Sequence, residues 1–111
     1  MKTIKDKKHN LEWKVEDEGE MSWYEAIGLE LTDGWRVPTI KELLTLISYE
    51  NHNPALRKKF LKFACPSLFY WSASPYAGNS DDAWGVGFYY GYSYHYGKYK
   101  SKYVRLVRDL K

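Results

Sequence analysis

The sequence predicts an α+β domain in which two helices from the first half pack on a twisted antiparallel β-sheet from the second half. Two segments before residue 50 start with Ser or Thr followed three residues later by Glu, the capping box of a helix. After Pro66, apolar residues alternate with small or polar ones, which is the period of a half-buried strand. The 111 residues, 44% of them hydrophobic, fit a single domain spanning residues 1–111.

The first half begins with a strand and then a helix. LEWKVE, at residues 11–16, alternates apolar with charged residues, as a half-buried strand does. Ser22 and Glu25 form the first capping box, and the apolar residues behind it recur at helical spacing. This segment is therefore expected to be the first helix.

A stronger helix signal follows. Thr39 and Glu42 form the second capping box, and one apolar stripe behind it predicts a helix from about Ile40 to Ser48. ALRKKFLKFA, at residues 55–64, also has helical spacing. We expect a short third helix there, with these residues facing inward: Leu56, Phe60, Leu61 and Phe63.

The second half predicts four strands, at residues 68–74, 83–90, 91–98 and 102–110. In the second of these, Gly85 and Gly87 alternate with bulky residues. Glycines on one face of a strand leave room for another group to approach the backbone closely. We therefore expect side chains from elsewhere to pack over these two glycines.

Several ordered motifs resemble a known family. They are WRVPT at 35–39, WSAS at 71–74, Ala83-Trp84, and YVRLVR at 103–108, with LEWKV and SWYEAI before them. Together they are similar to the C-terminal domain family of collagen-like bacterial adhesins, the Lcl C-terminal domain. The resemblance implies a C-type-lectin-like fold with both termini close together. It also implies that the late strands and loops present the binding residues, as in related phage tropism-determinant domains.

Most other distinctive residues are interpreted as structural. We expect Trp35, Trp71 and Trp84 in the core, because buried aromatic rings supply the largest apolar area per residue. Arg36 and Arg105 are expected to form salt bridges or to bond loop carbonyls. The lone Cys65 cannot form an internal disulfide, and we expect it to be a small buried apolar residue.

No catalytic or cofactor motif is evident, so we expect neither an enzyme nor a cofactor. The histidines His9, His52 and His95 lack the spacing of zinc ligands. Residues 79–82, NSDD, supply oxygen atoms that could ligate calcium, but such polar turns are also common without a metal. We predict no metal site and leave calcium at this turn as the minority alternative.

The segment from Phe88 to Arg108 contains seven of the 11 tyrosines. Tyrosine offers a large, rigid surface with a hydroxyl at its tip, and interspersed Ser and Gly add adaptable hydrogen bonding. Such mixtures are typical of recognition surfaces, although tyrosine is also a good strand former that simply covers a sheet. We predict the following partner-binding residues: Tyr89, Tyr90, Tyr92, Tyr94, His95, Tyr96, Lys98 and Tyr99.

Three binding functions fit this segment. The first is docking on a protein, for instance by a phage or mobile-element protein that inhibits a host defence complex. The second is binding of a glycan or glycosaminoglycan, with Lys98, Lys100 and Lys102 meeting its anionic groups. The third is binding of single-stranded nucleic acid, which the net charge of only +3 disfavours. We favour a protein partner. No signal-peptide pattern or membrane-length apolar run is present, so we expect a cytoplasmic protein, with its oligomeric state open.

Overall fold

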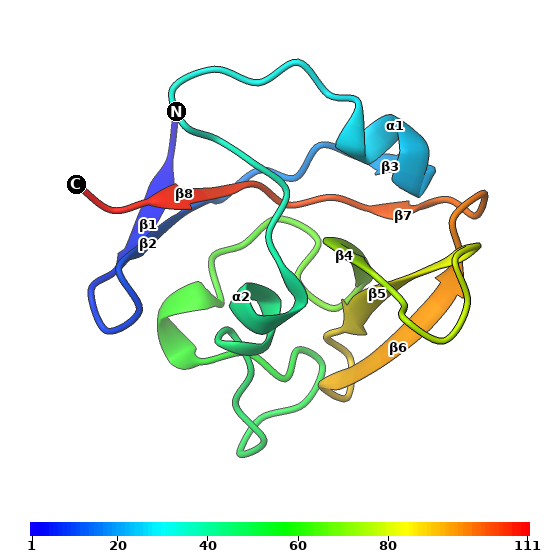
Figure 1. The fold of residues 1–111 in the computed structure, drawn as a ribbon. Helices are drawn as coiled ribbons and strands as arrows, with labels where there is room; N and C mark the ends of the chain where they lie inside the picture. The colour runs from blue at the N-terminus through cyan, green and yellow to red at the C-terminus, as the bar shows by residue number, and fades with distance from the viewer.

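The computed structural model describes residues 1–111 and contains short helices and eight strands (Figure 1). The elements are β1 (Thr3–Asp6), β2 (Leu11–Lys14), β3 (Glu20–Met21), α1 (Trp23–Ile27), α2 (Ile40–Leu44), the 3₁₀ helix η1 (Lys58–Phe60), β4 (Phe69–Pro75), β5 (Asp82–Gly87), β6 (Tyr92–Gly97), β7 (Lys102–Tyr103) and β8 (Val107–Asp109). None of the helices is long and apolar enough to cross a membrane.

The strands form two sheets. One has the order β1-β2-β8, and the other has the order β3-β7-β4-β5-β6. All pairings are antiparallel except that of β4 with β7. The predicted α+β class is confirmed. The arrangement differs from the prediction, because three short strands precede the first helix and the last strands divide between two sheets. Figure 1 shows both chain ends beside the three-stranded sheet.

Both predicted capping boxes are present. The Ser22 Oγ accepts a hydrogen bond from the Glu25 N–H (3.1 Å), and the Glu25 carboxylate accepts one from the Ser22 N–H (2.9 Å). Thr39 and Glu42 make the same reciprocal pair (3.2 and 2.9 Å). These bonds satisfy two otherwise unpaired N–H groups at the start of each helix.

The helix predicted to reach Ser48 ends earlier, at Leu44. Beyond it, the backbone bonds to a neighbouring segment instead of continuing the helix. The Ser48 N–H donates to the Ala55 carbonyl (3.1 Å), and the Arg57 N–H donates to the Leu46 carbonyl (2.9 Å). Tertiary hydrogen bonds therefore replace the last predicted turn.

The predicted third helix, residues 55–64, is wrong except for the single turn of η1. Ala55 is already committed to another partner, since its N–H donates to the Phe88 carbonyl (2.6 Å). The inward-facing assignment holds for most of its apolar residues. Leu56, Phe60 and Phe63 are buried, whereas Leu61 is exposed.

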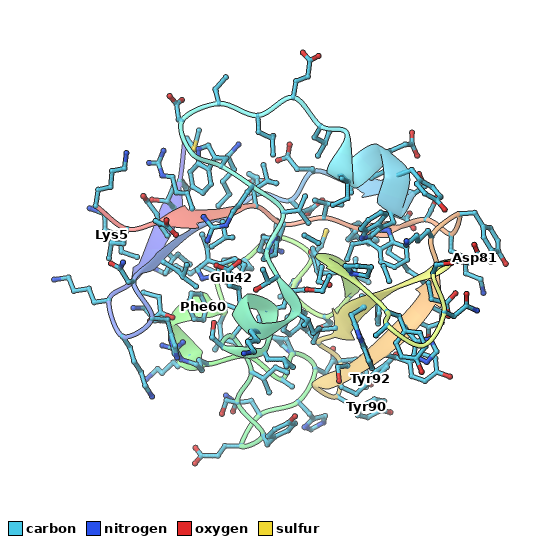
Figure 2. The ribbon with its side chains drawn as sticks, viewed as in Figure 1. Lys5, Glu42, Phe60, Asp81, Tyr90 and Tyr92 are labelled. Atoms are coloured by element: carbon cyan, nitrogen blue, oxygen red, sulfur yellow. The ribbon has the colours of Figure 1, made fainter.

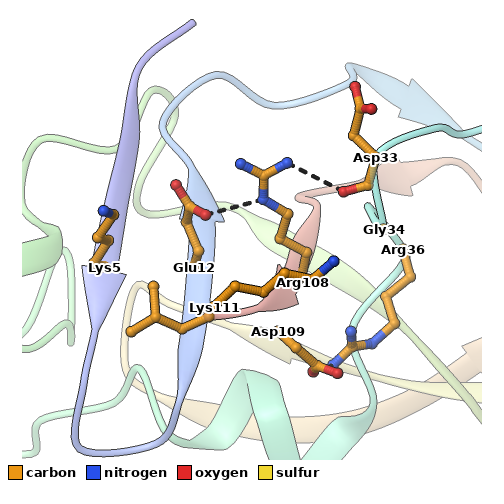
Figure 3. A pocket seen from close by; sticks show the side chains of 9 residues that line it. Lys5, Glu12, Asp33, Gly34, Arg36, Arg108, Asp109 and Lys111 are labelled. Atoms are coloured by element: carbon orange, nitrogen blue, oxygen red, sulfur yellow. Dashed lines mark hydrogen bonds and ion pairs between the residues drawn. The ribbon is translucent and has the colours of Figure 1, made fainter.

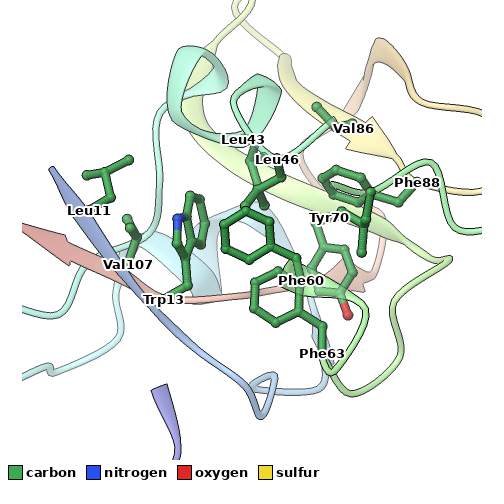
Figure 4. Packing of buried hydrophobic residues seen from close by; sticks show 11 residues of the cluster. Leu11, Trp13, Leu43, Leu46, Phe60, Phe63, Tyr70, Val86, Phe88 and Val107 are labelled. Atoms are coloured by element: carbon green, nitrogen blue, oxygen red, sulfur yellow. The ribbon is translucent and has the colours of Figure 1, made fainter. Parts of the chain in front are cut away.

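The core has two clusters of buried side chains. The first lies between β2, α2, η1 and the β4–β5 pair, and Figure 4 shows its rings meeting in the centre of the molecule. The second joins α1 to the other side of β4 and includes Trp35 and Trp71. The prediction that Trp84 lies in the core is wrong, because its side chain is half-buried and belongs to neither cluster. Its ring contacts Tyr76 edge-on instead (5.3 Å between centroids).

Arg105 is buried and cross-links four segments. Its guanidinium donates to the carbonyls of Val15 (2.6 Å) and Ala64 and to the Tyr70 hydroxyl (2.7 Å). It also lies 4.0 Å from the centroid of the Phe63 ring. Burial lowers the pKa of this guanidinium. The structural interpretation of Arg105 is confirmed. The same holds for Arg36, which pairs with Glu42 and Asp109.

A buried ion pair predicts how stability depends on pH. Hydrogen bonds from Arg57 (2.8 and 3.1 Å) hold the pKa of the buried Asp6 carboxyl at about 2, below its ordinary 3.8. A depressed carboxyl pKa stabilises the fold at neutral pH, and this contribution is lost as the pH falls from about 4 to about 2. The stability advantage of the wild type over Asp6→Asn should shrink by about 2 kcal/mol across that window. Urea unfolding at pH 6 and at pH 2 measures it, and an unchanged difference would contradict the pairing.

Candidate functional site

The predicted binding residues lie on β6 and its two flanking turns. β6 is the outermost strand of its sheet, so one of its edges has no neighbouring strand. Tyr90 (67% exposed), Tyr94 (49%) and Tyr99 (76%) are open to solvent. Tyr89 and Tyr92 are also exposed, whereas His95, Tyr96 and Lys98 are half-buried. Figure 2 shows Tyr90 and Tyr92 together at one end of β6 and Asp81 near the other end.

Three tyrosines and one phenylalanine share one face of the sheet. The strand register sets Tyr92 opposite Gly87 and Tyr94 opposite Gly85, and opposite residues point to the same face. The prediction that other groups pack over these glycines is confirmed. A Cβ at Gly87 would meet the Tyr92 ring, and one at Gly85 would meet the Phe69 ring. We call this surface, made of Phe69, Tyr92, Tyr94 and Tyr96, the tyrosine face.

The rings of the tyrosine face support one another. Phe69 meets Tyr96 edge-on, with centroids 4.9 Å apart, and Tyr94 lies 5.3 Å from Tyr96. Partial burial, together with the neighbouring Tyr96, raises the pKa of the Tyr92 hydroxyl. The hydroxyl therefore stays protonated at neutral pH and can donate a hydrogen bond to a ligand.

Lysines border the tyrosine face. The Lys102 ammonium lies 4.0 Å from the Tyr96 ring centroid and 5.2 Å from that of Phe69. Lys100 lies 5.5 Å from the Tyr96 centroid. In the loop between β6 and β7, Lys98 lies over the Trp23 ring at 4.6 Å. Cations at these distances are attracted by the ring faces.

His95 belongs to a separate cluster on the opposite face of β6. Its ring stacks on Tyr76 (3.8 Å, 6° between planes), and its Nδ1 lies 2.8 Å from an Asp82 oxygen. The Tyr94 ring, 4.8 Å from that of His95, connects the two clusters around the open edge of the strand. The structure therefore brings His95 close to Tyr94 but not onto the tyrosine face.

The remaining predicted residues lie on the turns. Tyr89 and Tyr90 are in the β5–β6 turn, with ring centroids 4.6 Å apart. The Asn53 N–H donates to the Tyr89 carbonyl (2.7 Å), which ties this turn to the loop that carries Tyr49. Tyr99 packs beside Gly97 in the β6–β7 turn. The two turns thus extend the exposed aromatic surface beyond both ends of β6.

Sequence reasoning missed Phe69, Tyr76 and Tyr49 as part of this surface. Phe69 joins the surface through its pairing with Gly87 across the ladder, and this register cannot be read from the sequence. The other two residues come from loops, whose positions depend on tertiary contacts. The Tyr49 ring lies beside Gly91 in the β5–β6 turn.

No three His, Cys, Asp or Glu side chains converge in a way that could hold a metal ion. In the turn considered for calcium, the Asn79 side chain accepts a hydrogen bond from the Asp81 N–H (2.9 Å), and Asp82 pairs with His95. The prediction that Cys65 is buried is wrong. It is exposed in a turn with φ of 50°, and partial desolvation raises its pKa, so its thiol is not activated.

The hollows of the molecule lie away from the tyrosine face. A polar one of about 540 Å³ is lined by charged residues near the chain ends (Figure 3). In this hollow, Arg108 donates to the Glu12 carboxylate (2.9 Å) and to the Asp33 carbonyl (3.1 Å), and Arg36 pairs with Asp109. A second, shallow hollow of about 380 Å³ is apolar and lies beside α1.

The ordered motifs of this chain and its Tyr-rich late strands fall within a match to a known protein family. The profile of the Lcl C-terminal domain matches residues 2–108. The chain belongs to the Lcl C-terminal domain family. The resemblance inferred from the motifs is thereby confirmed over almost the whole chain. No curated protein sequence matches this Lcl C-terminal domain. Membership of the family suggests an adhesin-like binding module.

Proposed function

We propose that this domain is a non-enzymatic binding module of C-type-lectin-like fold that docks its tyrosine face on a protein partner. The observation that carries the proposal is the tyrosine face itself. Exposed rings on an edge strand contact one another and Phe69, so they are held in place before any partner arrives. Rigid aromatic side chains lose little conformational entropy on binding, and they are common at interface hot spots.

The flanking features support a macromolecular partner. The rings of Tyr89 and Tyr90 continue the surface at one end of β6, and Tyr99 does so at the other. Such a surface is exposed and runs the length of a strand, unlike the concave pockets that enclose small molecules. A phage or mobile-element inhibitor of a host defence complex is one protein of this kind. An adhesin-type domain that stacks tyrosines on a glycan is the second candidate, favoured by the three bordering lysines.

A double substitution tests the proposal. Tyr92→Ala with Tyr94→Ala should abolish capture of a protein partner from a bacterial lysate. It should lower the free energy of unfolding by only about 1–2 kcal/mol, since both rings are half exposed. Tyr24→Ala is the matched control, because Tyr24 is an exposed ring on α1 and is not one of the rings of the tyrosine face. The readouts are pull-down at low and moderate salt and urea unfolding.

The same experiment separates the alternatives. A protein that binds wild type and Tyr24→Ala, resists moderate salt and is lost with the double variant supports the proposal. Recovery only of nucleic acid or sulfated glycan, released at moderate salt, would contradict it. So would a large loss of stability with unchanged binding per folded molecule, because the two rings would then be structural.

A further inference from the structure

The four arginines and the lysines of this chain have different interaction partners. Arg36, Arg57 and Arg108 pair with carboxylates, and Arg105 bonds buried carbonyls. No lysine forms an ion pair with a carboxylate anywhere in the structure. The arginines therefore hold the fold, whereas no lysine charge is neutralised by a carboxylate. The Lys98 ammonium donates a hydrogen bond to the Ser80 carbonyl (2.6 Å), which carries no net charge.

Three of these free charges border the tyrosine face. Lys100 and Lys102 lie over the ring of Tyr96, and Lys98 lies over that of Trp23. A ring attracts a cation but carries no net charge. The three ammonium groups therefore leave a local positive potential beside exposed rings, and this potential favours a negatively charged partner.

Acidic side chains limit what that partner can be. Glu20, on β3, is close enough to Tyr103 to raise the pKa of its hydroxyl, and its neighbour Met21 pairs with Lys102. A second acidic residue, Asp81, comes directly before β5 and lies beside Lys98. The Lys98 N–H donates a hydrogen bond to the Asp81 carbonyl (2.8 Å). A uniformly charged polyanion would meet these carboxylates, whereas a chain with a few spaced carboxylates can avoid them.

The positions of the tyrosines favour an extended segment. Tyr92, Tyr94 and Tyr96 occupy alternate positions of one strand, so their Cα atoms repeat about every 7 Å along it. The alternate side chains of an extended peptide have the same repeat. A segment laid along β6 can rest apolar side chains on the exposed rings and place carboxylates near the lysines at the Gly97 end.

We propose that the tyrosine face binds an extended acidic segment of a protein, whose carboxylates pair with Lys98, Lys100 and Lys102. This inference rests on the proposed function and adds the chemical class of the partner. A nucleic acid, a sulfated glycan and a second copy of this chain are the competing occupants.

Labelled peptides of equal length test the proposal, each with Val alternating with Ser along the segment and with two Glu, two Gln or two Lys residues at one end. Binding is measured by fluorescence anisotropy at low salt. The Glu peptide should bind about tenfold more tightly than the Gln peptide, and the Lys peptide should not bind. Lys100→Gln with Lys102→Gln should remove most of that advantage, so that this variant binds the Glu and Gln peptides about equally. Lys7→Gln with Lys8→Gln, in the exposed β1–β2 turn, is the control and should change neither affinity.

Each contrary outcome contradicts a defined part of the two proposals. Equal binding of the Glu and Gln peptides, abolished by Tyr92→Ala with Tyr94→Ala, would overturn the acidic preference and leave the proposed function standing. Failure of all three peptides to bind would also overturn the acidic segment. Tighter binding of heparin or of single-stranded oligonucleotide than of the Glu peptide would overturn both proposals. A dimer in sedimentation that Tyr94→Ala dissociates would assign the face to a second copy.

Discussion

Arg105→Met is expected to lower the free energy of unfolding by about 4 kcal/mol, a large share of the 5–15 kcal/mol typical of a domain. The guanidinium is 2% exposed and has no carboxylate partner. It is stabilised by the carbonyls of Val15 and Ala64 and by the Tyr70 hydroxyl. Methionine fills the space but leaves these buried oxygens without their charged donor.

Two further variants show whether geometry or charge matters at this position. Arg105→Lys should recover less than half of the loss, because one ammonium group cannot reach acceptors on several sides at once. Arg108→Met, which breaks a partly exposed pair with Glu12, should cost about 1 kcal/mol. Urea unfolding followed by tryptophan fluorescence measures all three. A loss below 1 kcal/mol for Arg105→Met would mean that water or backbone movement satisfies the carbonyls.

Gly85→Ala is expected to cost about 3 kcal/mol or more. A Cβ at this position would lie within 3 Å of the Tyr70 carbonyl oxygen and of the Phe69 ring. The ring can turn, but the carbonyl belongs to the central pair of strands in the five-stranded sheet and cannot move without breaking their register. The substitution should therefore disturb both the sheet and the base of the tyrosine face.

Gly87→Ala is the matched comparison. The atoms nearest to the added Cβ would all belong to Tyr92, whose side chain is half exposed and can swing outward. We expect a stability loss of about 1 kcal/mol or less together with weaker partner binding, since the ring would leave its place. Thermal unfolding and peptide anisotropy distinguish the two variants. Equal stability losses for Gly85→Ala and Gly87→Ala would contradict the distinction between backbone and side-chain contacts.

The features that could be predicted from sequence are those decided by nearby residues. The two capping boxes depend on residues three positions apart, and the alternation around Gly85 and Gly87 depends on one strand. The end of α2 and the course of residues 55–64 could not be predicted in this way. Their backbone bonds go to segments such as Phe88 that lie far away along the chain.

The candidate site was predictable in its composition but not in its layout. The density of tyrosines in the sequence indicated residues 89–99 as a candidate surface, and in the structure Tyr92 and Tyr94 are exposed. The periodicity of a strand also separates His95 from the tyrosines, which the composition alone obscured. Contributions from Phe69, Tyr76 and Tyr49 require the register of β4 and β5 or the positions of loops. The prediction for Trp84 was wrong because its ring, although on an inner strand, packs against Tyr76 and His95 and not against a core cluster.

The pairing of β2 with β8 has a consequence for how the chain acquires its structure. Leu11 lies opposite Asp109, and Arg105 bonds the carbonyl of Val15, so residues 11–15 depend on residues that are translated much later. The hairpin of β1 and β2 can form locally during synthesis, but Trp13 cannot be enclosed until residues 105–109 have left the ribosome. Such distant contacts slow folding and leave apolar surface open in the meantime. This domain should therefore complete its fold only after translation of that segment, and its nascent first half is the stage at which chaperones would be needed.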